Sequence, residues 1–213
     1  MTEEHPIKII LIGESGVGKT NLIQVAMGNP FQNEFEPTIS SSYHEGDITF
    51  NNKKYYYELW DTAGQEVYRS LNKMFIKESK IVLVVFAVND RKSYEQINFW
   101  IKYAKESLEE HSFIMALVGN KSDLYMEQQI PDEEIKKMAE ALNIKIKITS
   151  AMDDAVGFKK FLEQLIKDYI TNIGLQLDNK KTFSLKSEKE EEIEEGNNNG
   201  IGTGNVKHKK NCC

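Results

Sequence analysis

The stretch Ile7-Lys8-Ile9-Ile10-Leu11-Ile12-Gly13-Glu14-Ser15-Gly16-Val17-Gly18-Lys19-Thr20 decides the fold of this chain. An apolar run that predicts a buried strand leads into a glycine-rich turn, and a segment with helical spacing follows. Glycines let backbone N–H groups turn inward around phosphates, the Lys19 amine can reach the β- and γ-phosphates, and the Thr20 hydroxyl can bind Mg²⁺. A plain glycine-rich turn, the alternative, would not require Gly, Lys and Thr at these offsets. We therefore interpret residues 13–20 as a phosphate-binding loop, with nucleotide-binding candidates Gly13, Glu14, Ser15, Gly16, Val17, Gly18, Lys19 and Thr20.

Strand-like and helix-like segments alternate along the rest of the chain, which is typical of an α/β domain built on a parallel sheet. The apolar runs that predict buried strands are Ile7–Ile12, Ile81–Val88, Phe113–Val118 and Ile144–Ile148. Helical spacing covers Lys19–Met27, Ser93–Leu108, Asp132–Leu142 and Ala155–Ile173. Two further segments, Tyr43–Phe50 and Lys53–Trp60, flank Asn51-Asn52 and predict a β-hairpin. We expect a six-stranded, mostly parallel sheet with one antiparallel edge strand and helices on both faces.

The length, composition and charge of the chain limit the number of domains it can form and the kinds of partner it can bind. With 213 residues and 40% hydrophobic content, the chain has room for one packed domain. A net charge of −6 argues against nucleic acid as the main partner. Neither a secretory signal nor an apolar run of membrane-spanning length is present, so we expect a cytosolic domain. We assign residues 1–177 to it and residues 178–213, rich in Lys, Glu, Asn and Gly, to a disordered tail.

The base of the nucleotide is expected to meet Asn120-Lys121-Ser122-Asp123, which follows a predicted strand. A positioned Asp123 carboxylate can accept hydrogen bonds from both donors on the guanine edge, whereas adenine would leave it unpaired. The segment therefore predicts a preference for GTP over ATP, with Asn120, Lys121 and Asp123 as binding residues. Such a tetrapeptide is also a common exposed turn; its place after a phosphate loop and a strand favours the functional interpretation.

A third segment, Trp60-Asp61-Thr62-Ala63-Gly64-Gln65-Glu66, ends the hairpin's second strand and carries the groups that phosphoryl transfer needs. Asp61 can hold Mg²⁺ through a water molecule, and Gly64 can offer its N–H to the γ-phosphate. Gln65 can orient the attacking water and is the catalytic candidate. A polar loop of no function would not explain these three residue types at these offsets.

In this order and spacing, the three segments closely resemble the Ras superfamily of small GTPases, over about residues 7–173. The resemblance implies a single P-loop GTPase domain in which Thr38, within Pro37-Thr38-Ile39, completes the Mg²⁺ shell beside Thr20 and Asp61. It also implies that Phe31 packs on the guanine, although a core phenylalanine is an equal alternative from residue type alone. Within Thr149-Ser150-Ala151-Met152, the resemblance places Ser150, Ala151 and Met152 at the base. A lysine is usual where Met152 stands, and a methionine can cover the same face of the base, with nucleotide affinity retained or weakened.

Within the superfamily, the chain most resembles the Rab family. The resemblance rests on Trp60, on Tyr68-Arg69-Ser70-Leu71 and on the chain's two cysteines, Cys212 and Cys213, which end it. Paired terminal cysteines imply two geranylgeranyl groups, and two lipid chains give stable anchoring where one gives marginal binding. Unmodified surface thiols are the alternative. Two segments differ from the common Rab pattern, Ser40-Ser41-Ser42-Tyr43 and Phe86-Ala87-Val88, so the effectors and the compartment stay open.

The resemblance implies a GTP-hydrolysing switch that binds GTP or GDP with Mg²⁺ and recruits effectors to membranes in vesicle trafficking. Its implied partners are an exchange factor, a GTPase-activating protein, effectors at the switch loops, a prenylation escort and a GDP-dissociation inhibitor. The resemblance further implies that the protein is lipid-anchored on the cytoplasmic face of an intracellular or plasma membrane and cycles through the cytosol. A Ras-like signalling GTPase and a non-cycling guanine-nucleotide-binding module remain alternatives. An ATP-dependent kinase is disfavoured by Asp123.

Overall fold

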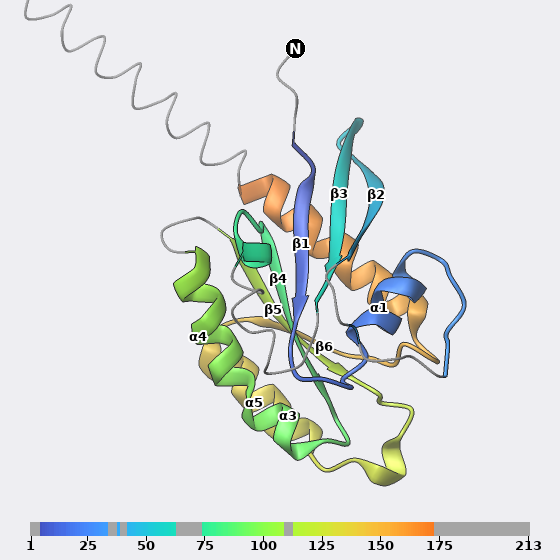
Figure 1. Cartoon of the computed structure of the whole chain (residues 1–213), viewed down its shortest axis with the longest axis vertical. Coiled ribbons are helices and arrows are strands. Elements are labelled where there is room, and N and C mark those ends of the chain that lie inside the picture. The colour runs from blue at the N-terminus through green and yellow to red at the C-terminus, as the bar shows by residue number, and fades with distance from the viewer. Residues whose placement is uncertain (1–4, 34–37, 39–41, 63–73, 109–112, 173–213) are drawn as a thin grey trace, which may run out of the picture. The chain divides into compact units, whose positions relative to one another are not determined.

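The computed structural model describes residues 5–33, 38, 42–62, 74–108 and 113–172 (Figure 1). Inter-residue contacts divide the chain into two units, Met1–Ile170 and Thr171–Cys213. The first unit contains the whole sheet. Within the described ranges no helix has both the length and the apolar character needed to cross a bilayer.

Six strands form one sheet in the order β2-β3-β1-β4-β5-β6. Their bounds are β1 Ile7–Ile12, β2 Ser42–Phe50, β3 Lys53–Asp61, β4 Ile81–Ala87, β5 Ile114–Asn120 and β6 Lys145–Ile148. All neighbouring pairs are parallel except β2 and β3, which pair antiparallel at the edge. The predicted α/β fold with a mostly parallel sheet and one antiparallel edge strand is therefore confirmed.

The edge hairpin turns where the sequence predicted it. Asn51 and Asn52 lie between β2 and β3 with φ of 50° and 60°, and Phe50 pairs with Lys53 across the turn. A two-residue hairpin loop with both residues in the left-handed region matches the right-handed twist of the strands, and asparagine tolerates that region better than most residues. This hairpin places Asp61, the last residue of β3, close to the carboxyl end of the neighbouring strand β1.

Helices cover both faces of the sheet. Their bounds are α1 Lys19–Ala26, α3 Arg91–Glu95, α4 Ile97–Leu108 and α5 Asp132–Leu142, and residues 155–172 form one more helix. In Figure 1, α3, α4 and α5 lie on one side of the sheet, and α1 and the helix that begins at residue 155 lie on the other. A short 3₁₀ turn, Tyr125–Glu127, follows β5.

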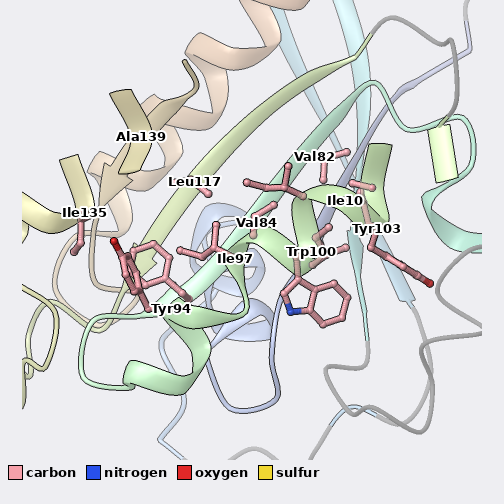
Figure 2. Close-up of a cluster of buried hydrophobic side chains, with 14 of the residues drawn as sticks. Ile10, Val82, Val84, Tyr94, Ile97, Trp100, Tyr103, Leu117, Ile135 and Ala139 are labelled. Carbon is pink, nitrogen blue, oxygen red and sulfur yellow. The ribbon is translucent and has the colours of Figure 1, made fainter. Parts of the chain in front are cut away.

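The core divides between the two faces because alternate strand residues point in opposite directions. On one face Ile10, Val82 and Val84 pack with Ile97 and Trp100 of α4 (Figure 2). The alternate residues of the same strands, whose side chains point to the other face, are also fully buried. They include Ile9, Leu11, Leu83 and Val85. A strand buried on both faces has no polar alternation, which is why β1 and β4 appear in the sequence as continuous apolar runs.

Most described boundaries lie within one residue of the sequence prediction, and two differ by two residues. The helix expected over Ser93–Leu108 is divided into α3 and α4 by Gln96 and begins earlier, because the Asp90 side chain accepts hydrogen bonds from the N–H groups of Lys92 and Ser93. This is an ordinary N-cap. Strand β5 extends to Asn120, which pairs with Ala87 of β4. Asn120 is therefore the last strand residue instead of the first loop residue.

Candidate nucleotide-binding site

The predicted binding segments meet at one edge of the sheet, beyond the carboxyl ends of β1, β3 and β5. Parallel strands bring these ends together, and ligands of open α/β sheets bind there. Loop residues 13–18 follow β1, Asp61 closes β3 and Asn120 closes β5. The fold therefore places all three motifs around one cavity, although they are separated by about forty and then sixty residues along the chain.

Two glycines of the phosphate loop have structural reasons to lack a side chain. Gly13 has φ of +148°, and a Cβ there would lie 2.1 Å from the Val85 carbonyl oxygen of β4. Gly18 caps α1 in the left-handed region with φ of +91°, and a Cβ there would lie 2.3 Å from Asn120 Nδ2. The loop is therefore held close against β4 and the base-binding motif, with the α1 N-terminus facing the cavity. A helix N-terminus with free N–H groups favours a phosphate.

Lys19 is the buried cation of the site, with only 5% of its surface exposed. Its amine donates hydrogen bonds to the carbonyl oxygens of Gly13 at 2.9 Å and Glu14 at 2.8 Å. Burial lowers the pKa of Lys19 to about 8, while the carboxylates of Asp61 and Glu14 act in the opposite direction. Burying an ammonium group is costly unless an anion compensates it. The arrangement is therefore suited to an anionic ligand such as a phosphate.

Three oxygen-bearing side chains meet beside Lys19. Thr20 Oγ1 donates to Asp61 Oδ2 at 2.7 Å and lies 3.0 Å from the hydroxyl of Thr38, which comes from the segment before β2. Burial raises the pKa of Asp61, although the Thr20 hydroxyl and the Lys19 charge oppose that rise. The second carboxylate oxygen, Asp61 Oδ1, is buried and has no hydrogen-bond partner among the described residues.

This oxygen set fits a magnesium ion. Mg²⁺ prefers oxygen ligands and retains several waters, so two hydroxyls and one outer carboxylate are a suitable donor set. The unpartnered Asp61 Oδ1 would gain a partner in a metal-bound water. Within the described ranges, no group of three or more His, Cys, Asp or Glu side chains that could hold a metal ion is present.

Asn120 and Asp123 are fixed by hydrogen bonds to the other two loops. Asn120 Nδ2 donates to the Val17 carbonyl at 2.9 Å, and Asn120 Oδ1 accepts from the Ala151 N–H at 3.1 Å. Asp123 Oδ1 accepts from the Ser150 hydroxyl at 2.6 Å. The asparagine therefore fastens the phosphate loop to the base loops, and the serine orients the carboxylate that is expected to select guanine.

A cavity of about 450 Å³ lies between these loops, which is enough for a small-molecule ligand. The predicted residues that line it are Ser15, Gly16, Gly18, Lys19, Thr20, Phe31, Thr38, Asn120, Lys121, Asp123, Ala151 and Met152. Gly13, Glu14, Val17, Asp61 and Ser150 are not in the lining, but each is joined to a lining residue by one of the hydrogen bonds already described. Gly64, Gln65, Cys212 and Cys213 lie outside the described residues.

Four lining residues were not predicted: Asn21, Asn33, Thr62 and Leu124. Asn21 supports the segment that carries Phe31, because its side chain donates to the Gln32 carbonyl at 3.0 Å and accepts from the Gln32 N–H at 3.3 Å. Buried Thr62 donates to the Leu11 carbonyl at 2.6 Å. All four residues lie within two positions of a predicted site residue. That closeness was the only feature of the sequence that could have indicated a place in the cavity lining.

An aromatic column beside the site was also not predicted. The rings of Tyr43 and Trp60 stack at 5.0 Å, and Phe75 follows at 6.0 Å from Trp60. The Lys8 amine lies 4.3 Å from the centre of the Trp60 ring. Tyr43 is 50% exposed, so the column reaches the surface of the protein at this end. The column crosses three separate segments of the chain, so no local pattern in the sequence reveals it.

The fold and the cavity define a phosphate-loop nucleotide-binding protein. Comparison with known proteins is more specific: the model of the Ras family matches residues 8–171, and the chain belongs to that family. It is 36% identical to the Ras-related protein RabC of Dictyostelium discoideum over 79% of this chain and 86% of RabC. It is 35% identical to the GTP-binding protein ypt3 of Schizosaccharomyces pombe over 70% of each chain, and 31% identical to the dog Ras-related protein Rab-25 over 81% and 80%.

These relatives confirm the predicted resemblance to Rab proteins. The chain is a Rab-like small GTPase, an enzyme that hydrolyses GTP to GDP and phosphate. GTP or GDP and Mg²⁺ are general ligands of the family, and the donor set at Thr20, Thr38 and Asp61 fits the metal.

Proposed function

We propose that this protein is a Mg²⁺-dependent switch whose GTP form recruits effectors to a membrane in vesicle trafficking. One observation carries the proposal: Thr38, from the segment before β2, lies 3.0 Å from the Thr20 hydroxyl beside the unpartnered Asp61 Oδ1. Thr38, which lies in no helix or strand, would then share the metal site with Thr20 of α1 and Asp61 of β3. Its position would depend on the ligand, as a switch segment requires.

Nucleotide selection is assigned to the base loops. We propose that Asp123 accepts from guanine, that Asn120 joins the loops around it, and that Ala151 and Ser150 support the base. Phe31 and Met152 line the cavity and are the proposed apolar covers of the base, with Lys121 beside them. The hydrogen bond from Ser150 restrains the Asp123 carboxylate, and a restrained side chain loses little conformational freedom when it binds a base.

Phosphoryl transfer is assigned to the phosphate loop and the segment after β3. Lys19 and the loop N–H groups would hold the β- and γ-phosphates, with Thr20, Thr38 and Asp61 holding the metal. A magnesium ion held by these residues would supply positive charge to offset the negative charge that develops on the phosphate oxygens. Gly64 would bind the γ-phosphate and Gln65 would orient the attacking water. Residues 13–20 contain no arginine, so a GTPase-activating partner is expected to add positive charge.

Gln65→Leu tests the switch, because leucine cannot orient water. We expect GTP hydrolysis to fall at least about tenfold, with guanine-nucleotide binding retained. Glu127→Leu, in the 3₁₀ turn and outside the cavity lining, is the matched control for surface change. Equal hydrolysis by the Gln65 variant and the wild type would remove Gln65 from its role. A wild type that binds GTP without any turnover would instead favour the non-cycling module.

The tail assignments remain proposals. Residues 178–213 are proposed as a tether that ends in geranylgeranylated Cys212 and Cys213, preceded by Lys207-His208-Lys209-Lys210, which would favour an anionic membrane surface. An escort protein and a GDP-dissociation inhibitor would then handle the lipids, and an exchange factor would act at the membrane. Replacing both cysteines with serine should leave the protein cytosolic. Continued membrane association of that variant would contradict the proposal.

The effector surface is proposed to include the aromatic column formed by Tyr43, Trp60 and Phe75. It starts at the beginning of β2, a few residues from Thr38, so a change at the metal site could reach it over a short distance. Aromatic side chains supply much of the binding energy at protein interfaces. A Ras-like signalling partner would use the same surface, so identification of the partner that the GTP form captures separates the two alternatives.

A further inference from the structure

The phosphate loop is connected to α4 by a hydrogen bond that no nucleotide-binding motif predicts. The indole nitrogen of Trp100 donates to Glu14 Oε1 at 3.0 Å, over 86 residues of sequence. The main chain of Glu14 is held from the other side, since its carbonyl oxygen accepts from the Lys19 amine at 2.8 Å. Glu14 is therefore fixed between the lysine of the site and a helix of the core.

Trp100 is a rigid donor. It is 2% exposed and packs edge-on against Phe99 at 5.4 Å and Tyr103 at 5.8 Å between ring centroids. Figure 2 shows it on α4 at the margin of the cluster that joins this helix to the sheet. Because close packing leaves the indole little freedom, the position of its N–H is set by the core and not by the ligand.

The first half of the loop thus has two fixed points. Gly13 lies directly against β4, where a Cβ would be 2.1 Å from the Val85 carbonyl, and Glu14 is tied to α4. Ser15 and Gly16, the next two residues, are exposed and line the cavity. In the proposed site they lie beside the terminal phosphate of the ligand. A small displacement of Glu14 would therefore be transmitted to the groups nearest the reacting phosphate.

We infer that Trp100 is a positioning residue for GTP hydrolysis, which acts through the carboxylate of Glu14 to fix the phosphate loop. The inference rests on the proposed nucleotide site. It goes beyond that proposal by assigning a role in turnover to a core residue that is not among those lining the cavity. A misplacement of about 1 Å caused by a change far from the chemistry can lower the reaction rate about 100-fold.

A double-mutant cycle on the full-length protein tests this role. Trp100→Phe removes the donor but keeps an aromatic ring in the core, and Glu14→Ala removes the acceptor. We expect each to lower the kcat for GTP about five- to tenfold, with a smaller change in KM and in GDP dissociation. The double variant should be no slower than either single variant, because both remove the same interaction. Glu14→Gln keeps an acceptor oxygen and should recover most of the rate that Glu14→Ala loses.

Ser107→Ala is the control on the same helix, since it removes the hydrogen bond from the Ser107 hydroxyl to the Tyr103 carbonyl without reaching the loop. It should leave kcat unchanged. Independent, multiplying effects of the two single variants, or a Gln variant as slow as the Ala variant, would overturn the inference. Failure of the wild type to bind GDP or hydrolyse GTP would instead refute the proposed site, so the two failures are distinguishable.

Discussion

The Thr20 hydroxyl donates a 2.7 Å hydrogen bond to Asp61 Oδ2 and so joins the first turn of α1 to the last residue of β3. The two residues are 41 positions apart, and the contact requires the parallel pairing of β3 with β1. It leaves Asp61 Oδ1 buried and without a hydrogen-bond partner among the described residues. A buried, unpaired carboxylate oxygen is costly, so its retention is explained by a ligand that completes it.

Asp61→Asn should make nucleotide retention insensitive to Mg²⁺. An amide can still accept from Thr20 but carries no charge to hold metal-bound water, and loss of an outer-shell carboxylate weakens a metal by about 10- to 100-fold. The measurement is GDP dissociation with and without a chelator. Wild type should release GDP faster when chelated, whereas the variant should release it fast in both conditions. Asp47→Asn is the control, because Asp47 forms an ion pair at the surface with a side chain that is 49% exposed, and this variant should behave as wild type. If Asp61→Asn responded to the chelator as wild type does, the assignment of Asp61 to the metal site would be contradicted.

Asp123→Asn should change the base preference of the site from guanine to xanthine. The carboxylate is expected to accept from two guanine donors, whereas an asparagine side chain presents one acceptor oxygen and one NH₂ group, which suit an N–H and the additional carbonyl of xanthine. We expect GDP affinity to fall on the order of 100-fold and xanthosine diphosphate to bind better than GDP. Competition binding with both nucleotides measures this. Unchanged preference for GDP would show that Asp123 does not contact the base.

Met152→Lys should slow GDP dissociation. Met152 lines the cavity and is 54% exposed, so a lysine there could lay its stem on the base without entering the core. A cation over an aromatic face contributes enough to slow dissociation roughly two- to fivefold. Met126→Lys is a matched control, since Met126 is 85% exposed and is not part of the lining. If both variants slowed GDP release equally, the effect would come from surface charge and not from the base.

Asp154→Ala should destabilise the loop that carries Ser150 and Met152. Asp154 accepts from the Thr149 hydroxyl and from the Gly157 N–H at the start of the last helix. Burial acts to raise the pKa of Asp154, but the hydrogen bonds from Lys147 and Thr149 outweigh it and hold the pKa below 3.8. The hydrogen bond from Gly157 makes Asp154 the N-cap of this helix, and loss of an N-cap lowers the free energy of unfolding by about 1 kcal/mol.

The pH dependence of this variant follows from the lowered pKa. A carboxylate whose pKa is lower in the folded state stabilises it above the unfolded value of 3.8, and that stability is lost as the pH falls further. Denaturant unfolding should therefore show a wild-type advantage over Asp154→Ala at neutral pH that shrinks below about pH 4. Asp153→Ala removes a neighbouring charge but not the cap and should show no such trend. A difference between wild type and Asp154→Ala that is constant with pH would refute the assignment.

The sequence predicted the layers of the fold well because its signals are local. Continuous apolar runs indicated β1 and β4, which are buried on both faces, and Asn51-Asn52 indicated the hairpin. The break between α3 and α4 was missed because the hydrophobic spacing continues across it and only the Asp90 cap marks the true start.

The site was predicted unevenly for the same reason. Each motif is a short local pattern, so its residue types could be assigned, and the fold then brought Lys19, Asp61 and Asn120 together. Contacts made by side chains from distant segments left no such pattern. The predicted hairpin register already places Tyr43 opposite Trp60, but the stacking of their rings and the hydrogen bond from Trp100 to Glu14 depend on side-chain packing, which only the folded chain reveals.

Identification of the nucleotide that the purified protein carries tests the central claim most directly. The protein is denatured and the released ligand is identified by chromatography. Tight retention by the proposed contacts of Lys19, the metal-binding residues and the base loops, together with turnover, predicts GDP at close to one equivalent per chain. An adenine nucleotide in its place would contradict the role of Asp123 and with it the assignment of this site to guanine.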